Sequence, residues 1–147
     1  MLYGKPGSGK STLTIEFAHY LAREHNKKVL YIADEEKLGQ ILHEKIKLLK
    51  AIHKNLYLAD KTPSEEMKFD FIFIDSVNSM KFEPQCLNKL DRKFPKTSFI
   101  YIFQTTKEGI FKGQQELEHL VDTVIKTEIT DNIHSKAFTE KNMPITR

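Results

Sequence analysis

The chain has 147 residues, of which 39% are hydrophobic and 29% are charged, and its formal net charge is +3. This length suits one domain with a core of its own, so we expect a single domain over residues 1–147. The mild positive charge is compatible with nucleic acid but does not indicate it. The single cysteine, Cys86, excludes an internal disulfide, and no apolar run is long enough to span a membrane, so we expect a cytoplasmic protein.

Helical and strand-like patterns alternate along the chain. In chain order they predict a helix over 10–24, a strand within 27–36, a helix over 36–54, strands over 55–60 and 69–76, a helix over 84–93, a strand over 97–106, a helix over 114–121, and strands over 122–129 and 134–141. The last two strands are candidates for an antiparallel pair. Alternation of this kind predicts an α/β fold with a mostly parallel sheet flanked by helices. In such sheets the chemistry gathers at the carboxyl ends of the strands.

The segment from Gly4 to Ser11, GKPGSGKS, has the spacing G-x-x-x-x-G-K-[ST] of a phosphate-binding loop, or P-loop. Glycines let the backbone turn tightly, so that its N–H groups and the start of the next helix face an anion. Lys10 is expected to reach the β- and γ-phosphates, and the Ser11 hydroxyl to bind Mg²⁺. The predicted nucleotide-binding residues are Gly4, Lys5, Pro6, Gly7, Ser8, Gly9, Lys10, Ser11 and Thr12.

Two features of the predicted strands bear on this site. Asp75 ends the apolar run FIFID and is expected to hold Mg²⁺ opposite Ser11; the simpler alternative is an aspartate that begins a turn. Only Met1, Leu2 and Tyr3 precede the loop, whereas a strand typically has about five residues. The first strand is therefore predicted to be a stub, either truncated or short enough to close its sheet as it stands.

Further segments carry a family resemblance. GKPGSGKST, VLYIADEE, FIFIDSVNSM, the TKEG segment followed by LEHLVDTV, and HSKAFTEKNMP together resemble the ATPase core of RadA (also called Sms), a bacterial RecA-like recombination and branch-migration family. The resemblance covers nearly the whole chain, in the same order. It implies a RecA-like P-loop fold in a minimal or truncated form, with ATP as the nucleotide.

The resemblance also implies roles for residues outside the P-loop. Glu35 matches the acid that polarises the attacking water, with Glu36 as the alternative, and Gln104 matches the sensor of the γ-phosphate. The predicted catalytic residues are thus Lys10, Glu35 and Gln104. In the loop after Gln104, the candidate DNA contacts are Lys107, Phe111 and Lys112, or that loop is simply exposed. His119 and Asp122 also match family positions, although helix packing and capping explain them more simply.

The chain departs from the family at its carboxyl end. Of the K-N-R-F-G motif, Lys141 and Asn142 are retained, but Met143 and Pro144 replace the arginine and the phenylalanine. In the family's ring this strand lends basic residues to a neighbouring subunit's ATP, so Lys141 is a candidate contact in trans and fast hydrolysis is in doubt. The family's four-cysteine zinc segment and its Lon-protease-like domain do not occur in these residues.

Three hypotheses follow. The first is a Mg²⁺-dependent RecA-like ATPase that acts on single-stranded or branched DNA in recombination or repair, as a homo-oligomeric ring or filament. The second is a switch or adaptor that binds ATP and a protein partner with little turnover. The third is a loader related to replicative helicases, which share the same core.

Overall fold

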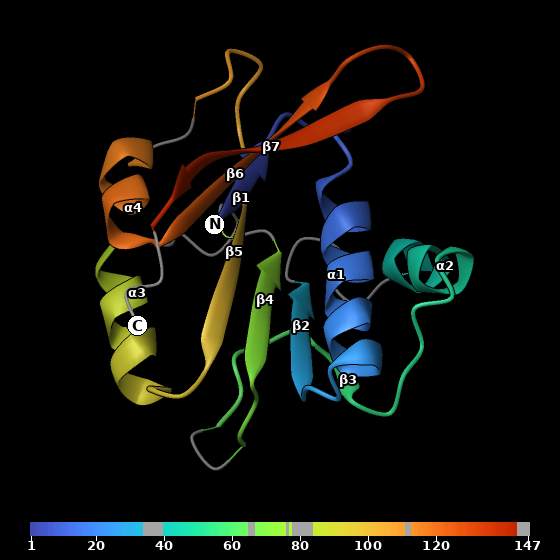
Figure 1. Ribbon diagram of the computed structural model, residues 1–147, viewed down its shortest axis with the longest axis vertical. Coiled ribbons are helices and arrows are strands. Elements are labelled where there is room, and N and C mark those ends of the chain that lie inside the picture. The colour runs from blue at the N-terminus through green and yellow to red at the C-terminus, as the bar shows by residue number, and fades with distance from the viewer. Residues whose placement is uncertain (34–39, 65–66, 76, 78–83, 111–112, 144–147) are drawn as a thin grey trace.

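The computed structural model describes residues 1–33, 40–64, 67–75, 77, 84–110 and 113–143. One sheet lies between two layers of helices, with α1 and α2 on one side and α3 and α4 on the other (Figure 1). The elements are β1 (Leu2–Gly4), α1 (Lys10–Glu24), β2 (Val29–Ala33), α2 (Gln40–Leu48), β3 (Leu56–Ala59), β4 (Phe71–Asp75), α3 (Pro84–Lys93), β5 (Ser98–Gln104), α4 (Gln114–Leu120), β6 (Thr123–Ile129) and β7 (Ser135–Asn142).

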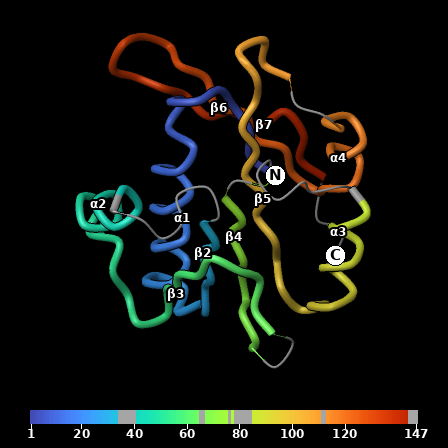
Figure 2. Tube along the Cα trace, turned by 180° about the vertical axis from the view of Figure 1, so that it is seen from behind, coloured from blue at the N-terminus to red at the C-terminus, as the bar shows by residue number. Residues whose placement is uncertain are grey.

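The seven strands follow the order β3-β2-β4-β5-β1-β6-β7. All neighbouring pairs from β3 to β6 are parallel, and β6 and β7 pair antiparallel. The predicted fold class and the predicted antiparallel pair are thus confirmed. In both views the β6–β7 hairpin extends past the first turn of α1 (Figures 1 and 2).

Each face of the sheet has its own apolar core. On one face, Ile15 and Ala18 of α1 and Leu42 of α2 pack against alternate residues of the central strands. On the other face, Leu87 of α3 and Leu117 of α4 do the same. Strands β2 and β4 are buried on both faces, as their continuous apolar runs predicted. No helix in the described part of the chain is both long enough and apolar enough to cross a membrane.

The helix predicted over 36–54 ends earlier than predicted, at Leu48. Lys50 has a left-handed backbone (φ 50°), its N–H donates to the Lys47 carbonyl, and the Ala51 N–H donates to the Ile46 carbonyl. These two hydrogen bonds form a Schellman-type helix end, in which glycine is the usual left-handed residue. The apolar spacing continues through Ile52, which is why the pattern predicted a longer helix, but Ile52 is 75% exposed.

Strand β1 has three residues, as short as predicted, and Met1 precedes it. The Met1 ammonium donates a hydrogen bond to the Thr123 carbonyl, at the start of β6. Burial lowers the pKa of this amino group to about 6, although the nearby Asp122 carboxylate acts in the opposite direction. Above about pH 6 the folded chain therefore holds this amine mostly uncharged, because the protein interior disfavours the charged form.

The Met1 amino group should make stability depend on pH. Its pKa falls from 8.0 in the unfolded chain to about 6 in the fold, so the unfolded chain binds more protons between these values. The free energy of unfolding should therefore rise from pH 6 to pH 8, by roughly 2 kcal/mol. Urea denaturation of the free and the amino-terminally acetylated chain across this range would measure the effect. Equal slopes for the two chains would contradict the prediction.

The left-handed residues after α1 and α2 offer a second test. Because an L-residue other than asparagine is strained at φ 50°, Lys50→Gly should stabilise the fold by about 0.5–1 kcal/mol, net of the entropy cost of glycine. Asn26 has a similar backbone angle (φ 51°), and asparagine tolerates it, so Asn26→Gly is the matched control with a smaller gain. Thermal denaturation of both variants measures the difference. A loss of stability in Lys50→Gly would be the opposite of what this helix end predicts.

Candidate nucleotide-binding site

The P-loop joins the end of β1 to the start of α1. Gly7 and Gly9 have positive φ angles of 76° and 81°, which side chains other than glycine rarely adopt. Gly9 is also the N-cap residue of α1, and it makes no side-chain capping hydrogen bond. The first N–H groups of α1 are therefore directed at the loop, as an anion site at a helix start requires.

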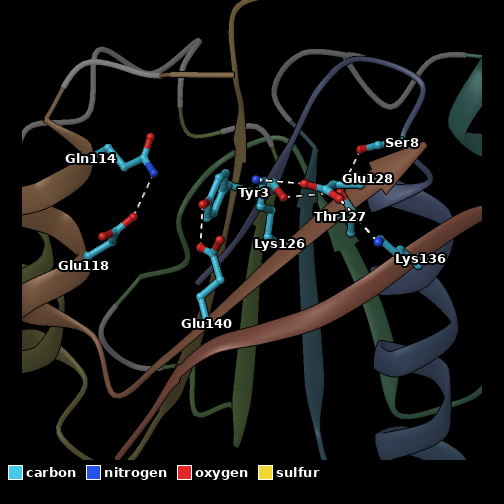
Figure 3. A network of polar contacts seen from close by, with 9 residues as sticks. All are labelled: Tyr3, Ser8, Gln114, Glu118, Lys126, Thr127, Glu128, Lys136 and Glu140. Carbon is cyan, nitrogen blue, oxygen red and sulfur yellow. Dashed lines mark hydrogen bonds and ion pairs between the residues drawn. The ribbon is translucent and has the colours of Figure 1, made fainter. Parts of the chain in front are cut away.

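Gly4 is required for a different reason, which is close packing. A Cβ atom at Gly4 would lie 2.2 Å from Thr127 Oγ1 and 2.8 Å from Ser8 Oγ. Ser8 Oγ and Thr127 Oγ1 are 2.7 Å apart, and Thr127 Oγ1 also donates to the Tyr3 carbonyl, at 3.2 Å (Figure 3). Both hydroxyls are buried. This packing fixes the base of the loop against β6.

Lys10 lies in the first turn of α1 and is only 8% exposed. Its Nζ donates to the carbonyl oxygens of Gly4 and Lys5, at 2.8 Å each. These bonds hold the amine across the loop, next to its inward-facing backbone. A phosphate oxygen is a stronger acceptor for an ammonium than a carbonyl is, so the amine is placed to exchange its partners.

Asp75 ends β4, opposite Ala33 of β2 in the register of the sheet. The hydroxyl of Tyr31 donates to Asp75 Oδ2 at 2.7 Å and lies 3.0 Å from Thr14 Oγ1. Thr14 Oγ1 in turn donates to the Lys10 carbonyl at 3.0 Å. Sequence reasoning missed Tyr31 and Thr14, which link the acid to the helix that follows the P-loop.

Gln104 ends β5 and lies beside Gly4 in the register of the sheet. The next N–H, that of Thr105, donates to the Gly4 carbonyl at 3.1 Å. The same carbonyl accepts the hydrogen bond from Lys10 Nζ. One oxygen atom therefore joins the P-loop lysine to the segment that follows the predicted sensor.

The loop after Gln104 contacts the P-loop again at its tip. Thr106 and Ile110 close a turn through the Ile110 carbonyl, and Gly109 has a positive φ of 86°. A Cβ atom at Gly109 would lie 3.9 Å from Lys5 Cε, so the tip passes close to that side chain. Of the three candidate DNA contacts, Lys107 is exposed on this loop, whereas Phe111 and Lys112 lie outside the described residues.

A network of polar contacts joins side chains of β1, β6 and β7 (Figure 3). The Tyr3 hydroxyl donates to Glu140 on β7, and burial, reinforced by this carboxylate, raises the pKa of Tyr3. Lys126 pairs with Glu128 at 2.8 Å. A cavity of about 490 Å³ lies beside this network, between the P-loop, β6 and the loop that follows Gln104, here called the sensor loop. Its lining includes Thr105, whose buried hydroxyl makes no hydrogen bond to the described residues.

The hairpin turn between β6 and β7 lies over the P-loop. A Cβ atom at Gly9 would lie 3.9 Å from Ser135 Cβ, and a hollow of about 340 Å³ runs between Gly7 and residues 129–135. In the turn, Asp131 accepts hydrogen bonds from the backbone N–H groups of Ile133 and His134. The P-loop thus has structured neighbours on both sides.

The residues present fit a Mg²⁺ ion of the kind that P-loop proteins use. No group of three or more His, Cys, Asp or Glu side chains gathers as a metal site among the described residues. Mg²⁺ keeps several waters and needs one or two protein oxygens in addition to substrate phosphates. Ser11, half-buried in the first turn of α1, and Asp75 at the end of β4 offer those oxygens.

The other site residues predicted from the sequence lie away from the P-loop or fall outside the residues that the structure describes. Glu35 and Glu36 fall within the undescribed residues 34–39. Lys141 pairs with Val124 on β6, at the opposite end of that strand from Thr127 and the P-loop. Its Nζ donates to the carbonyls of Glu118 and Val121, at 2.7 Å each, where α4 ends. Within its own chain, Lys141 therefore caps a helix. His119 and Asp122 are exposed near the same helix end.

The strand order, the P-loop after β1 and the acid at the end of β4, on the far side of β5 from β1, define a RecA-like P-loop NTPase fold. Residues 1–133 match the model of the family described as the AAA domain, and the chain belongs to this family. Its structure is similar to the flagellar accessory protein FlaH of Methanocaldococcus jannaschii, with a TM-score of 0.69 and 17% identity over 97% of this chain and 77% of that one.

Sequence comparison narrows the class to a RadA-like core. Over 143 residues the chain is 34% identical to DNA repair protein RadA of Helicobacter pylori, covering 83% of this chain and 32% of that protein. It is 33% identical to DNA repair protein RadA of Listeria monocytogenes, covering 83% of this chain and 31% of that protein. The chain thus spans about a third of the length of these curated relatives.

Tyr31 tests the link between the acid and α1. Tyr31→Phe removes one hydrogen bond from Asp75 without changing the ring, which stacks on Phe73. We expect a loss of about 1 kcal/mol in stability and a several-fold weaker Mg²⁺ dependence of nucleotide binding. Calorimetric titration with and without Mg²⁺ measures it. Tyr20→Phe is the matched control, because Tyr20 is 48% exposed; equal effects of the two variants would argue against the link.

Proposed function

We propose that this chain binds ATP with Mg²⁺ at the P-loop and hydrolyses it, as a RadA-like motor core in DNA recombination or repair in the cytoplasm. The observation that carries the proposal is the P-loop itself. Gly7 and Gly9 hold the left-handed backbone, α1 begins without a side-chain cap, and Lys10 lies across the loop. The similarity to proteins named DNA repair protein RadA supports the choice of process.

The residues divide the chemistry among them. The P-loop N–H groups and Lys10 would stabilise charge on the β- and γ-phosphates, and the hollow under the β6–β7 turn leaves room beside the loop for the nucleoside. Mg²⁺, held by Ser11 and Asp75, would neutralise phosphate charge. Glu35 would orient the attacking water, and Gln104 would contact the γ-phosphate from the end of β5.

The Gly4 carbonyl supports a route by which nucleotide would be signalled to the sensor loop. If Lys10 turns to a phosphate, Gly4 O keeps Thr105 N–H as a donor but loses the ammonium. The position of Thr105, and with it the loop that carries Lys107, would then depend on nucleotide. DNA bound to this loop would in turn favour one state of the lysine, because coupling between two sites is reciprocal.

A switch or adaptor with little turnover is the second candidate, and Lys141 favours it. In the family's ring the corresponding strand reaches a neighbouring subunit's ATP, but here the Lys141 amine is bonded to two carbonyls of its own chain. Met143 stands where the family has an arginine. An arginine supplied in trans is worth about 10³-fold or more in other NTPases.

ATP hydrolysis by the purified chain, with and without single-stranded DNA, separates the two candidates. We expect turnover that rises at least several-fold with DNA. Lys10→Ala should abolish it because the main cation on the phosphates is lost. Lys107→Ala is the matched control, since it removes an exposed cation outside the P-loop: it should lower stimulation by DNA and leave turnover without DNA unchanged. A chain that binds ATP but stays idle with DNA would support the switch instead.

A further inference from the structure

Helix α2 and the turn that follows it carry a dense group of lysines. Residues 40–54 contain Lys45, Lys47, Lys50 and Lys54, and their one acidic residue is Glu44. The formal net charge of this segment therefore equals the +3 of the whole chain. In both views α2 lies at the outer edge of the molecule, beside α1 (Figures 1 and 2). The segment thus presents positive charge to the surroundings.

The turn after α2 is held against the turn after α1. Val29 N–H donates to the Asn55 carbonyl at 2.8 Å, and Asn55 Nδ2 donates to Asn26 Oδ1 at 2.7 Å. These turns lead into β2 and β3 and lie at the amino ends of those strands, whereas the P-loop and the sensor loop follow the carboxyl ends of theirs. The basic segment therefore ends on the side of the sheet opposite the candidate nucleotide site.

Three of the lysines have no partner in the part of the chain that the structure describes. Lys47, Lys50 and Lys54 are exposed, and their ammonium groups make no hydrogen bond or ion pair there. Asp70, an acid at the same end of the sheet, already has Lys27 Nζ at 4.0 Å. Three ammonium groups are therefore available to an anion from outside.

Helix α3 has a similar number of cations, but carboxylates lie close to them. Lys89, Arg92 and Lys96 are exposed on α3 and the turn after it. Asp91 lies among them, and burial, followed by the nearby Asp122 carboxylate, raises the pKa of Asp91. These acids offset the positive charge of α3, so α3 serves as the comparison for α2.

The apolar side chains of α2 argue against a lipid surface as its partner. Leu42 and Ile46 are buried in the apolar core on this face of the sheet. Only Leu48 and Ile52 are strongly exposed, by 82% and 75%. A helix that binds lipid buries its whole apolar face in the membrane interface, and here that face is used within the fold. The lysines therefore suit a polymer of phosphates.

The aromatic rings at this surface favour a duplex over a single strand. The Tyr57 ring packs edge-on against Phe69 at 5.6 Å, and Lys28 Nζ lies 5.3 Å from its centre. Single-stranded nucleic acid is held by bases that stack on exposed rings, which here would displace existing contacts. In a duplex the bases stay stacked inside, and the phosphates meet the lysines first.

We propose that α2 and the turn after it form a second nucleic-acid contact, which binds the phosphate backbone of duplex DNA through Lys47, Lys50 and Lys54. This contact goes beyond the proposed function, which places DNA at the sensor loop, at the other end of the sheet. It responds to charge and not to base sequence, because phosphates carry no sequence information.

Fluorescence anisotropy of a labelled short DNA duplex, at several salt concentrations and without ATP, tests the proposal. The variant combines Lys47→Gln, Lys50→Gln and Lys54→Gln, which keep long side chains and remove three charges. We expect the affinity at low salt to fall by about tenfold or more. The slope of log affinity against log salt should become shallower by roughly 2.7, because each phosphate contact contributes about 0.9. Both effects should be equal for duplexes of different sequence.

The matched control removes the same charge from α3 and the turn after it, with Lys89→Gln, Arg92→Gln and Lys96→Gln. It should keep the affinity within about twofold and leave the salt slope unchanged. Thermal denaturation of both variants checks that the fold is retained, as the exposure of all six side chains predicts.

Equal losses in the two variants would mean that overall charge alone attracts DNA, and they would overturn the proposal. An unchanged salt slope in the α2 variant, or a loss confined to single-stranded DNA, would overturn it too. Binding to vesicles of anionic lipid that depends on these lysines, with duplex binding unchanged, would assign the surface to lipid instead. None of these readouts needs nucleotide, so failure here is distinct from failure of the proposed ATP hydrolysis.

Discussion

The hydrogen bonds that β1 makes on both of its edges are the contacts on which the rest of the fold depends. In the described sheet, β1 alone joins β3-β2-β4-β5 to β6-β7. It does so with three residues, Leu2–Gly4, each paired with both neighbours. The same three residues end in the P-loop. Stability of the sheet and geometry of the candidate site therefore share one short strand.

Gly4 shows how tightly these two roles are joined. Its α-carbon packs on Thr127 so closely that no side chain fits, and its carbonyl accepts bonds from Lys10 and Thr105. The first contact fixes the loop to β6, and the second connects the loop to the end of β5. A ligand that moved the P-loop would therefore change its contacts with both β6 and the end of β5. In this way a phosphate site could influence a segment that does not touch the phosphate.

The fold could be predicted from the sequence to the extent that local patterns determine it. Element types and their order followed from apolar spacing, and the meeting of Gly4, Asp75 and Gln104 at one edge followed from strand direction in a parallel sheet. The end of α2 could not, because Ile52 continues the helical spacing while the backbone at Lys50 breaks it. The bond between Tyr31 and Asp75 depends on β2 lying next to β4, which no local pattern reports.

At Leu13 and Phe17 the apolar spacing of α1 does not correspond to burial. Both lie on α1 at helical spacing, but they are 37% and 43% exposed, whereas Ile15 and Ala18 of the same helix pack on the sheet. The carboxyl end of β1 leads directly into the candidate nucleotide site. Ligand bound at the P-loop would stabilise the folded state by mass action at the same strand.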